Sequence, residues 1–211
     1  MRLRHKSWAE ELLANNRNLA LNKEDIEQGN LPQFTALEIG SGCGEFLIGK
    51  ALTHPEINFL GVEINRTAFA IAIKKLLVLE KVPNNIHFLN ADIALLLPTI
   101  KDESLDAIYL NFNDPWPKKK HNKRRLTYPT KLNEYYRILK TGGTLFYKSD
   151  NDVYYEGSKE YFTEFQKFDV EFIDNYEQTD VDDVQSEYEQ KFRTIGKSIH
   201  RIIATKGDKH E

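Results

Sequence analysis

Three acidic residues follow three apolar segments of the sequence, each at the point where a strand is expected to end. Glu38 lies in LEIGSGCGEF, Glu63 near the end of GVEI, and Asp92 closes NAD. In open α/β sheets ligands bind beyond the carboxyl ends of the strands, and an acid after the second strand usually accepts hydrogen bonds from ribose hydroxyls. An acid after the third strand can accept from an adenine amino group. Any one of these acids could simply cap a strand or a helix, but together they suit a ligand that carries a ribose, an adenine and a positive charge.

A glycine-rich turn follows the first of these acids. Gly40, Gly42 and Gly44 stand at alternate positions, where they let the backbone turn tightly and a ligand approach closely. The spacing G-x-G-x-G differs from the dinucleotide fingerprint G-x-G-x-x-G, and no G-K-[ST] of a phosphate-binding loop follows. The neighbouring carboxylates would also repel a pyrophosphate. We therefore expect Gly40 and Gly42 to border a cationic nucleoside rather than a dinucleotide.

A stiff acidic elbow follows the fourth expected strand, in the stretch NDPWPKKKHNKRR at residues 113–125. Pro115 and Pro117 fix their own φ angles and restrict the residues before them, Asp114 and Trp116, to extended conformations. Asp114 is thereby delivered to the same rim as the other acids. The Trp116 ring offers a face for a nucleic-acid base, a contact worth about 1–3 kcal/mol in single-stranded sites.

A basic arm continues directly from the elbow over residues 118–125. Its cations can hold phosphates, with an affinity that falls as salt is added. Standing alone, such a run would most often be a solvated loop. Because it adjoins an aromatic elbow at a candidate site, we expect it to bind the backbone of a nucleic acid.

The elements that must position these residues alternate between strands and helices, which predicts βαβ units and a mostly parallel sheet. The last two strands are close in sequence and can form an antiparallel edge. The expected strands are residues 34–40, 58–64, 85–92, 105–112, 142–150, 168–174 and 198–206. The expected helices are residues 8–20, 45–54, 66–81, 129–140, 153–165 and 186–192, with residues 22–33 as a linker.

The composition favours a cytoplasmic globular protein. Forty per cent of the 211 residues are hydrophobic, enough for a core, and no apolar run approaches the length that spans a bilayer. The basic N-terminus lacks the apolar stretch of a secretory signal. The single cysteine, Cys43, excludes an internal disulfide, and the histidines lack metal-ligand spacing. The net charge of −3 hides basic stretches at 1–6 and 118–125 and an acidic stretch at 169–189.

The motifs LEIGSGCGEF, GVEI and NAD resemble the S-adenosylmethionine site of class I methyltransferases. With RLRHK at 2–6, NDPWPKKKHNKRR, KSDN at 148–151 and SEYEQKF at 186–192, almost the whole chain resembles the bacterial tRNA (guanine-N7)-methyltransferases. The resemblance implies a Rossmann-like α/β fold with a mostly parallel seven-stranded sheet, an antiparallel edge strand, and helices on both faces. We expect an N-terminal basic segment and helix at 1–33 and the methyltransferase domain at 34–211.

The same resemblance implies a site for each ligand. Asp114 is the catalytic candidate. The positions that match the family's cofactor region are Glu38, Gly40, Gly42, Glu63, Asp92 and Asp114. Those that match its substrate contacts are Lys118, Asp150, Ser186, Glu187, Tyr188 and Glu189. Those that match its RNA-interacting run are Lys120, His121, Asn122, Lys123, Arg124 and Arg125. The family usually has Ser at Asn113 and Thr at Ser149 and Ser186, so this chain keeps polar side chains there.

The implied reaction is methyl transfer from S-adenosylmethionine to N7 of a guanine in the variable loop of a tRNA. N7 has a lone pair and no proton, so alignment and electrostatic stabilisation matter more than a general base. Asp150 or Glu187 could accept hydrogen bonds from the guanine N1–H and N2 amino groups. Methylation of an exocyclic amino group, as of adenine N6, and a non-catalytic RNA-binding module remain alternatives. We expect tRNA as the partner, and we expect no membrane or metal. The sequence does not decide whether the protein is a monomer or a homodimer.

Overall fold

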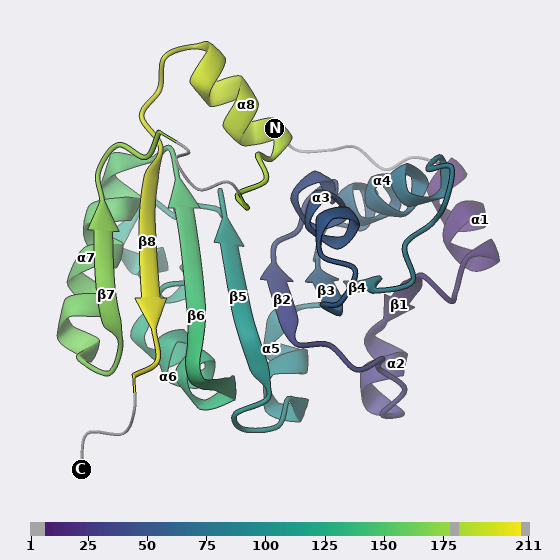
Figure 1. Ribbon diagram of the computed structural model, residues 1–211, viewed down its shortest axis with the longest axis horizontal. Helices are drawn as coiled ribbons and strands as arrows, with labels where there is room; N and C mark the ends of the chain where they lie inside the picture. Colours follow the sequence, from purple (N-terminus) through teal and green to yellow (C-terminus); the bar gives the residue numbers. More distant parts are fainter. Residues whose placement is uncertain (1–6, 178–181, 208–211) are drawn as a thin grey trace. The chain divides into compact units, whose positions relative to one another are not determined.

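The computed structural model describes residues 7–177 and 182–207, and the chain forms two compact units, Met1–Ile100 and Lys101–Glu211 (Figure 1). The basic stretch 1–6, including RLRHK, and part of the acidic stretch 169–189 lie outside the described residues. Within the described ranges no helix combines the length and apolar character needed to cross a membrane.

The first unit contains four strands in the order β1-β4-β3-β2, and every pairing between them is parallel. All residues of β2 and β3 are buried, as expected of parallel strands that are covered on both faces. Helix α1 packs against α4, and α3 packs against β3 and β4. The elements of this unit are α1 (Trp8–Asn15), β1 (Ala20–Asn22), α2 (Lys23–Glu27), β2 (Ala36–Ile39), α3 (Glu45–Thr53), β3 (Phe59–Val62), α4 (Arg66–Leu77), β4 (Ile86–Asn90), α5 (Ile93–Leu96) and the 3-10 turn η1 (Leu97–Thr99).

The second unit contains four strands in the order β5-β6-β8-β7. β6 is parallel to β5, whereas β8 runs antiparallel to both β6 and β7. Figure 1 shows α8 beyond the carboxyl ends of β5 and β6, where the strand arrows point. The elements are β5 (Leu105–Asn111), the 3-10 helix η2 (Lys119–Arg124), α6 (Pro129–Ile138), β6 (Leu139–Ser149), α7 (Asp152–Phe165), β7 (Asp169–Ile173), α8 (Glu187–Thr194) and β8 (His200–Thr205).

All seven expected strands are confirmed, and so is the antiparallel pairing of the last two. The linker predicted at 22–33 is wrong in part, because it contains helix α2 and adjoins an additional short strand, β1. With β1 the described residues form eight strands, one more than the seven expected. A capping box explains the helix: the Asn22 side chain accepts from the Glu24 amide at 2.8 Å, and the Asp25 carboxylate accepts from the Asn22 amide at 2.7 Å.

The first helix is also shorter than expected. α1 ends at Asn15, and the Asn16 side chain donates to the Leu12 carbonyl at 2.8 Å, satisfying one of the carbonyls that a helix end leaves unpaired. Strand β1 then pairs with β4, so the segment before residue 34 contributes to the sheet of the first unit. The division at residue 33 remains a prediction.

Candidate active site

The glycine turn wraps around the end of β3. The amides of Gly40 and Ser41 donate to the Val62 carbonyl at 2.8 and 3.1 Å, and the amide of Gly44 donates to the Ser41 carbonyl at 2.9 Å. The φ angles of Gly40, Gly42 and Gly44 are +78°, +54° and +84°, in the region that favours glycine. A Cβ built at Gly42 would meet no atom within 4 Å, so the backbone there borders open space. The turn is therefore a tight cradle with room beside it.

Glu63 holds this turn in place. Its carboxylate is buried, with 8% of the residue exposed, and accepts from the Gly42 amide at 2.9 Å and from the Asn65 amide at 2.6 Å. The Asn90 side chain fixes the backbone of the same residue by donating to the Glu63 carbonyl at 2.7 Å. A carboxylate oxygen can accept more than one hydrogen bond, so these two bonds are compatible with a further bond from a ligand hydroxyl.

Glu38, Glu63 and Asp92 lie at the same end of the first unit's sheet, because each is at or just beyond the carboxyl end of one of the neighbouring parallel strands β2, β3 and β4. Glu38 is 2% exposed and lies opposite Gly61 in the register of β2 and β3. Asp92 is exposed, and its Oδ1 accepts from the Ala94 amide at 2.9 Å as the N-cap of α5. The cap uses only one carboxylate oxygen, so capping and ligand binding are compatible at Asp92.

The elbow in the second unit is strained. Phe112 and Trp116 have φ angles of +51° and +42°, which are rare for bulky residues and persist only where the surroundings enforce them. The position of Trp116 before Pro117 predicted an extended conformation, and this prediction is wrong. The Arg124 guanidinium lies 4.8 Å from the centre of the Trp116 ring, and the His121 ring meets it edge-on at 5.8 Å. Asp114 is exposed on this elbow.

The basic arm divides into an exposed part and a buried part. The exposed residues are Lys118, Lys119, Lys120, Lys123 and Arg124, and the half-buried ones are His121 and Asn122. Arg125 differs from them, because it is 4% exposed and its Nε donates to the Pro115 carbonyl at 2.9 Å. The prediction of an RNA contact at Arg125 does not fit this burial, whereas its neighbours are placed as expected of phosphate-binding side chains.

Most of the predicted substrate residues, Asp150 and Ser186–Glu189, lie near the carboxyl ends of β5 and β6, whereas Lys118 is the N-cap of η2. The Phe112 amide donates to the Lys148 carbonyl at 2.9 Å, which joins the two strand ends, and Asp150 follows directly after β6. Asp150 forms an ion pair with Lys197, a side chain that is 47% exposed. The Phe112 and Phe192 rings, 5.9 Å apart, link the end of β5 to α8.

The segment from Ser186 to Glu189 starts helix α8, and its four side chains do different things. The Ser186 hydroxyl accepts from the Glu189 amide at 3.2 Å as the N-cap, a role that both Ser and Thr can fill. Glu187 and Tyr188 are exposed and can meet a substrate. Glu189 is 1% exposed and accepts from Lys148 at 2.9 Å and from Arg193 at 2.7 Å. The described contacts of Glu189 therefore anchor α8.

Sequence reasoning missed the cations that hold these acids. Lys148, 4% exposed, lies between Asp183 and Glu189, and Lys197 pairs with Asp150. The signal in the sequence was a lysine at the very end of a strand otherwise rich in buried apolar residues. A charge at such a position is rarely buried without a partner.

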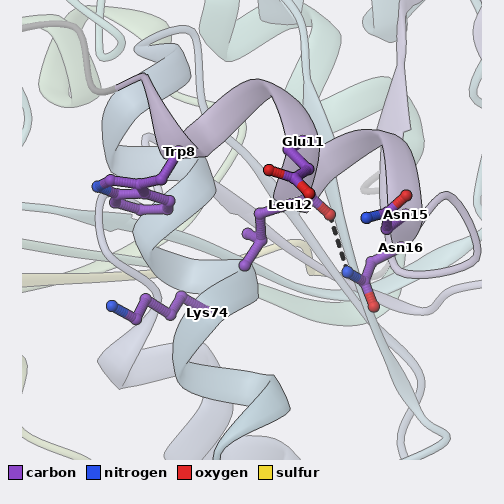
Figure 2. Close-up of a pocket in the computed structure, with 6 residues that line it drawn as sticks. All are labelled: Trp8, Glu11, Leu12, Asn15, Asn16 and Lys74. Carbon is purple, nitrogen blue, oxygen red and sulfur yellow. Dashed lines mark hydrogen bonds between the residues drawn. The ribbon is translucent and has the colours of Figure 1, made fainter.

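One pocket of about 330 Å³ lies between helices α1 and α4 of the first unit. Figure 2 shows the Trp8 ring above the Lys74 side chain, whose Nζ is 5.2 Å from the ring centre. The pocket is lined by Trp8, Glu11, Leu12, Asn15, Asn16 and Lys74. None of these residues was predicted to bind a ligand. Across the described ranges no group of three or more His, Cys, Asp or Glu side chains could hold a metal ion.

Solved structures show that the fold is that of class I methyltransferases. A SAM-dependent methyltransferase from Archaeoglobus fulgidus matches with a TM-score of 0.53 and 19% identity over 87% of this chain and 92% of that one. A tRNA (m1A58) methyltransferase from Aquifex aeolicus matches with a TM-score of 0.55 and 14% identity over 99% of this chain and 71% of that one. The predicted Rossmann-like fold is confirmed.

Sequence comparisons identify the family. Residues 32–202 match the family described as "Putative methyltransferase". The tRNA (guanine-N(7)-)-methyltransferase of Limosilactobacillus reuteri strain DSM 20016 is 41% identical over 97% of this chain and 99% of its own length. The corresponding enzyme of Bacillus subtilis strain 168 is 33% identical over 95% of this chain and 97% of its own length. The chain therefore belongs to this methyltransferase family, within its bacterial tRNA (guanine-N7)-methyltransferase branch.

Proposed function

We propose that the protein transfers a methyl group from S-adenosylmethionine to N7 of a guanine in the variable loop of tRNA. The observation that carries the proposal is the 41% identity with a tRNA (guanine-N(7)-)-methyltransferase over 97% of the chain. We propose further that it acts in the cytoplasm as a monomer or a homodimer.

The residues of the first unit fit S-adenosylmethionine. When bound, this cofactor supplies an electrophilic methyl group on a positively charged sulfur. The Glu63 carboxylate, which two backbone amides hold, would accept hydrogen bonds from ribose hydroxyls, and the second oxygen of Asp92 would accept one from the adenine amino group. Glu38 contributes a buried carboxyl group, which a cationic ligand would favour in its ionised form. The open space beside Gly42 could accommodate part of the ligand.

The residues of the second unit would hold the acceptor. The guanine N7 lone pair would take the methyl group as its bond to sulfur breaks, so that the positive charge would pass from the sulfur to the purine ring. The exposed carboxylate of Asp114 is our candidate for stabilising that charge. No proton leaves N7, so Asp114 need not act as a base.

Recognition of guanine is assigned to the acids around the start of α8. Asp150 or Glu187 could accept hydrogen bonds from N1–H and the N2 amino group, a pair of donors that adenine lacks. Asp150 already pairs with Lys197, so the base would share or displace that partly exposed cation. The exposed side chains of the arm, with Lys118 nearest the elbow, would hold the tRNA backbone.

The test is methylation of an unmodified tRNA transcript with labelled S-adenosylmethionine, followed by borohydride and aniline cleavage, which cuts at N7-methylguanine. We expect one cleavage site in the variable loop and none with Asp114→Ala. A product identified as N6-methyladenine would overturn the proposal, and so would binding of transcript without any methyl transfer.

A further inference from the structure

Arg125 stands apart from the other cations of the basic arm. It is the C-cap residue that follows η2, and only 4% of it is exposed, whereas Lys123 and Arg124 in η2 are exposed. A phosphate in solution cannot reach a guanidinium buried in this way without a rearrangement. Its charge must therefore serve contacts inside the protein.

Those contacts join the elbow to helix α7. The Arg125 Nε donates to the Pro115 carbonyl at 2.9 Å, and the guanidinium lies 5.3 Å from the centre of the Tyr154 ring. Burial raises the pKa of Tyr154 to about 12, and the nearby Arg125 charge acts in the opposite direction. The guanidinium thus bridges two segments that are far apart in the sequence.

Gly157 provides the space for this bridge. A glycine inside a helix costs about 1 kcal/mol relative to alanine, so its place in the middle of α7 needs a reason. A Cβ built at Gly157 would lie 2.6 Å from the Arg125 Nη1 atom, closer than real Cβ atoms come to their neighbours. The missing side chain leaves the slot that the guanidinium occupies.

The bond to Pro115 acts at the strained point of the elbow. The Pro115 carbonyl belongs to the peptide group that immediately precedes Trp116, whose φ angle is +42°. The orientation of that peptide plane is coupled to the φ angle of Trp116 and to the backbone that carries Asp114. A strained backbone persists only where the surroundings hold it, and Arg125 is a buried, charged donor placed to do so.

We propose that Arg125, seated in the slot at Gly157, is a positioning residue that fixes the Asp114–Trp116 elbow for methyl transfer. The proposal rests on the function proposed above, which assigns Asp114 and Trp116 to the site. It replaces the phosphate contact predicted for Arg125. The other cations of the arm remain candidates for binding the tRNA backbone.

The experiment compares Arg125→Met and Gly157→Ala with the parent protein. Gly157→Ala keeps every group of Arg125 and intrudes only on its slot, so it remains informative if Arg125→Met does not fold. Glu160→Ala, an exposed change on the same helix, is the matched control. Because small misplacements of reacting groups are costly, we expect kcat to fall on the order of 10- to 100-fold in both test variants. The KM for tRNA and the affinity for S-adenosylhomocysteine should change little.

A second measurement does not depend on activity. The protein has two tryptophans, so the change Trp8→Phe leaves Trp116 as the only fluorescent indole. In that background, acrylamide quenching of Trp116 should increase in both test variants and stay unchanged in Glu160→Ala. Retention of parental kcat and quenching in Gly157→Ala would overturn the proposal. Unchanged kcat with a raised KM in Arg125→Met would also overturn it, in favour of a direct RNA contact. If the parent protein methylates no tRNA, the proposed function fails, and quenching still decides whether Arg125 holds the elbow.

Discussion

Replacement of Lys148 by methionine should destabilise the second unit strongly. Lys148, Asp183 and Glu189 have side chains that are 4%, 6% and 1% exposed, so the change leaves two buried carboxylates without their shared cation. Removal of one partner from a buried ion pair costs about 3–5 kcal/mol. Glu189 keeps its bond to Arg193, which favours the lower end of this range. For a chain of this length, about 3 kcal/mol corresponds to a decrease in melting temperature of roughly 6–12 °C.

The same change should weaken tRNA binding, because Lys148 ties the end of β6 to helix α8. We expect a higher KM for tRNA and an unchanged affinity for S-adenosylhomocysteine. Lys191→Met is the matched control, since Lys191 is an exposed lysine on helix α8. Surface substitutions of this kind are usually within about 0.5 kcal/mol of neutral.

A double-mutant cycle then tests the pairing itself. Glu189→Gln removes one of the two buried charges, so combining it with Lys148→Met should cost less than the sum of the single changes. Coupled neighbours typically differ from additivity by about 0.5–3 kcal/mol. Chemical denaturation of the four proteins supplies the measurement. Additive free energies of unfolding, or a Lys148→Met protein as stable as Lys191→Met, would refute the reasoning.

Three further outcomes are expected. Glu63→Gln should weaken binding of S-adenosylhomocysteine about 10- to 100-fold by calorimetry, because a charged acceptor of two backbone amides is lost; native affinity would contradict the assignment of Glu63. The triple change of Lys119, Lys120 and Lys123 to alanine should raise the Kd for tRNA and reduce the slope of log K against log salt by roughly 2–3; an unchanged slope would show that these cations do not contact phosphates. Burial lowers the pKa of His87 below its ordinary 6.5, so the unfolded chain binds more protons and the free energy of unfolding should fall as the pH decreases below about 6.5. Chemical denaturation at about pH 7.5 and 5.5 should show a smaller loss of stability in His87→Gln than in the parent protein. An equal loss in both proteins would refute this cause.

The sequence predicted the strands well because each core strand is a short apolar run bounded by polar or glycine residues. It also predicted that Glu38, Glu63 and Asp92 would share an edge, since parallel topology alone places successive strand ends together. It failed at residues 20–27, where a three-residue strand and a five-residue helix are too short for periodicity to reveal. Their formation depends on pairing with β4 and on a local capping box.

The sequence predicted the burial of individual charged side chains less well than it predicted the strands. The sequence places Arg124 and Arg125 side by side with identical chemistry, yet one is exposed over Trp116 and the other is buried against Pro115. The deciding feature is Gly157, about thirty positions away, which no local pattern connects to the arm. A prediction from spacing could therefore assign the arm to RNA as a whole but not separate its members.

The buried cations of the second unit explain how an elbow at the surface can be rigid. Lys148 fixes α8 against β6, and Arg125 fixes the elbow against α7, so both sides of the acceptor region are tied to the sheet or its covering helix. A methyl transfer that needs no proton exchange depends on alignment more than on acid–base chemistry. We therefore expect the buried charges to serve catalysis through geometry, and the exposed lysines of the basic arm to serve it through affinity. Loss of Arg125 should therefore appear in kcat, loss of Lys148 in stability and in the KM for tRNA, and loss of the exposed lysines in the KM and its salt dependence.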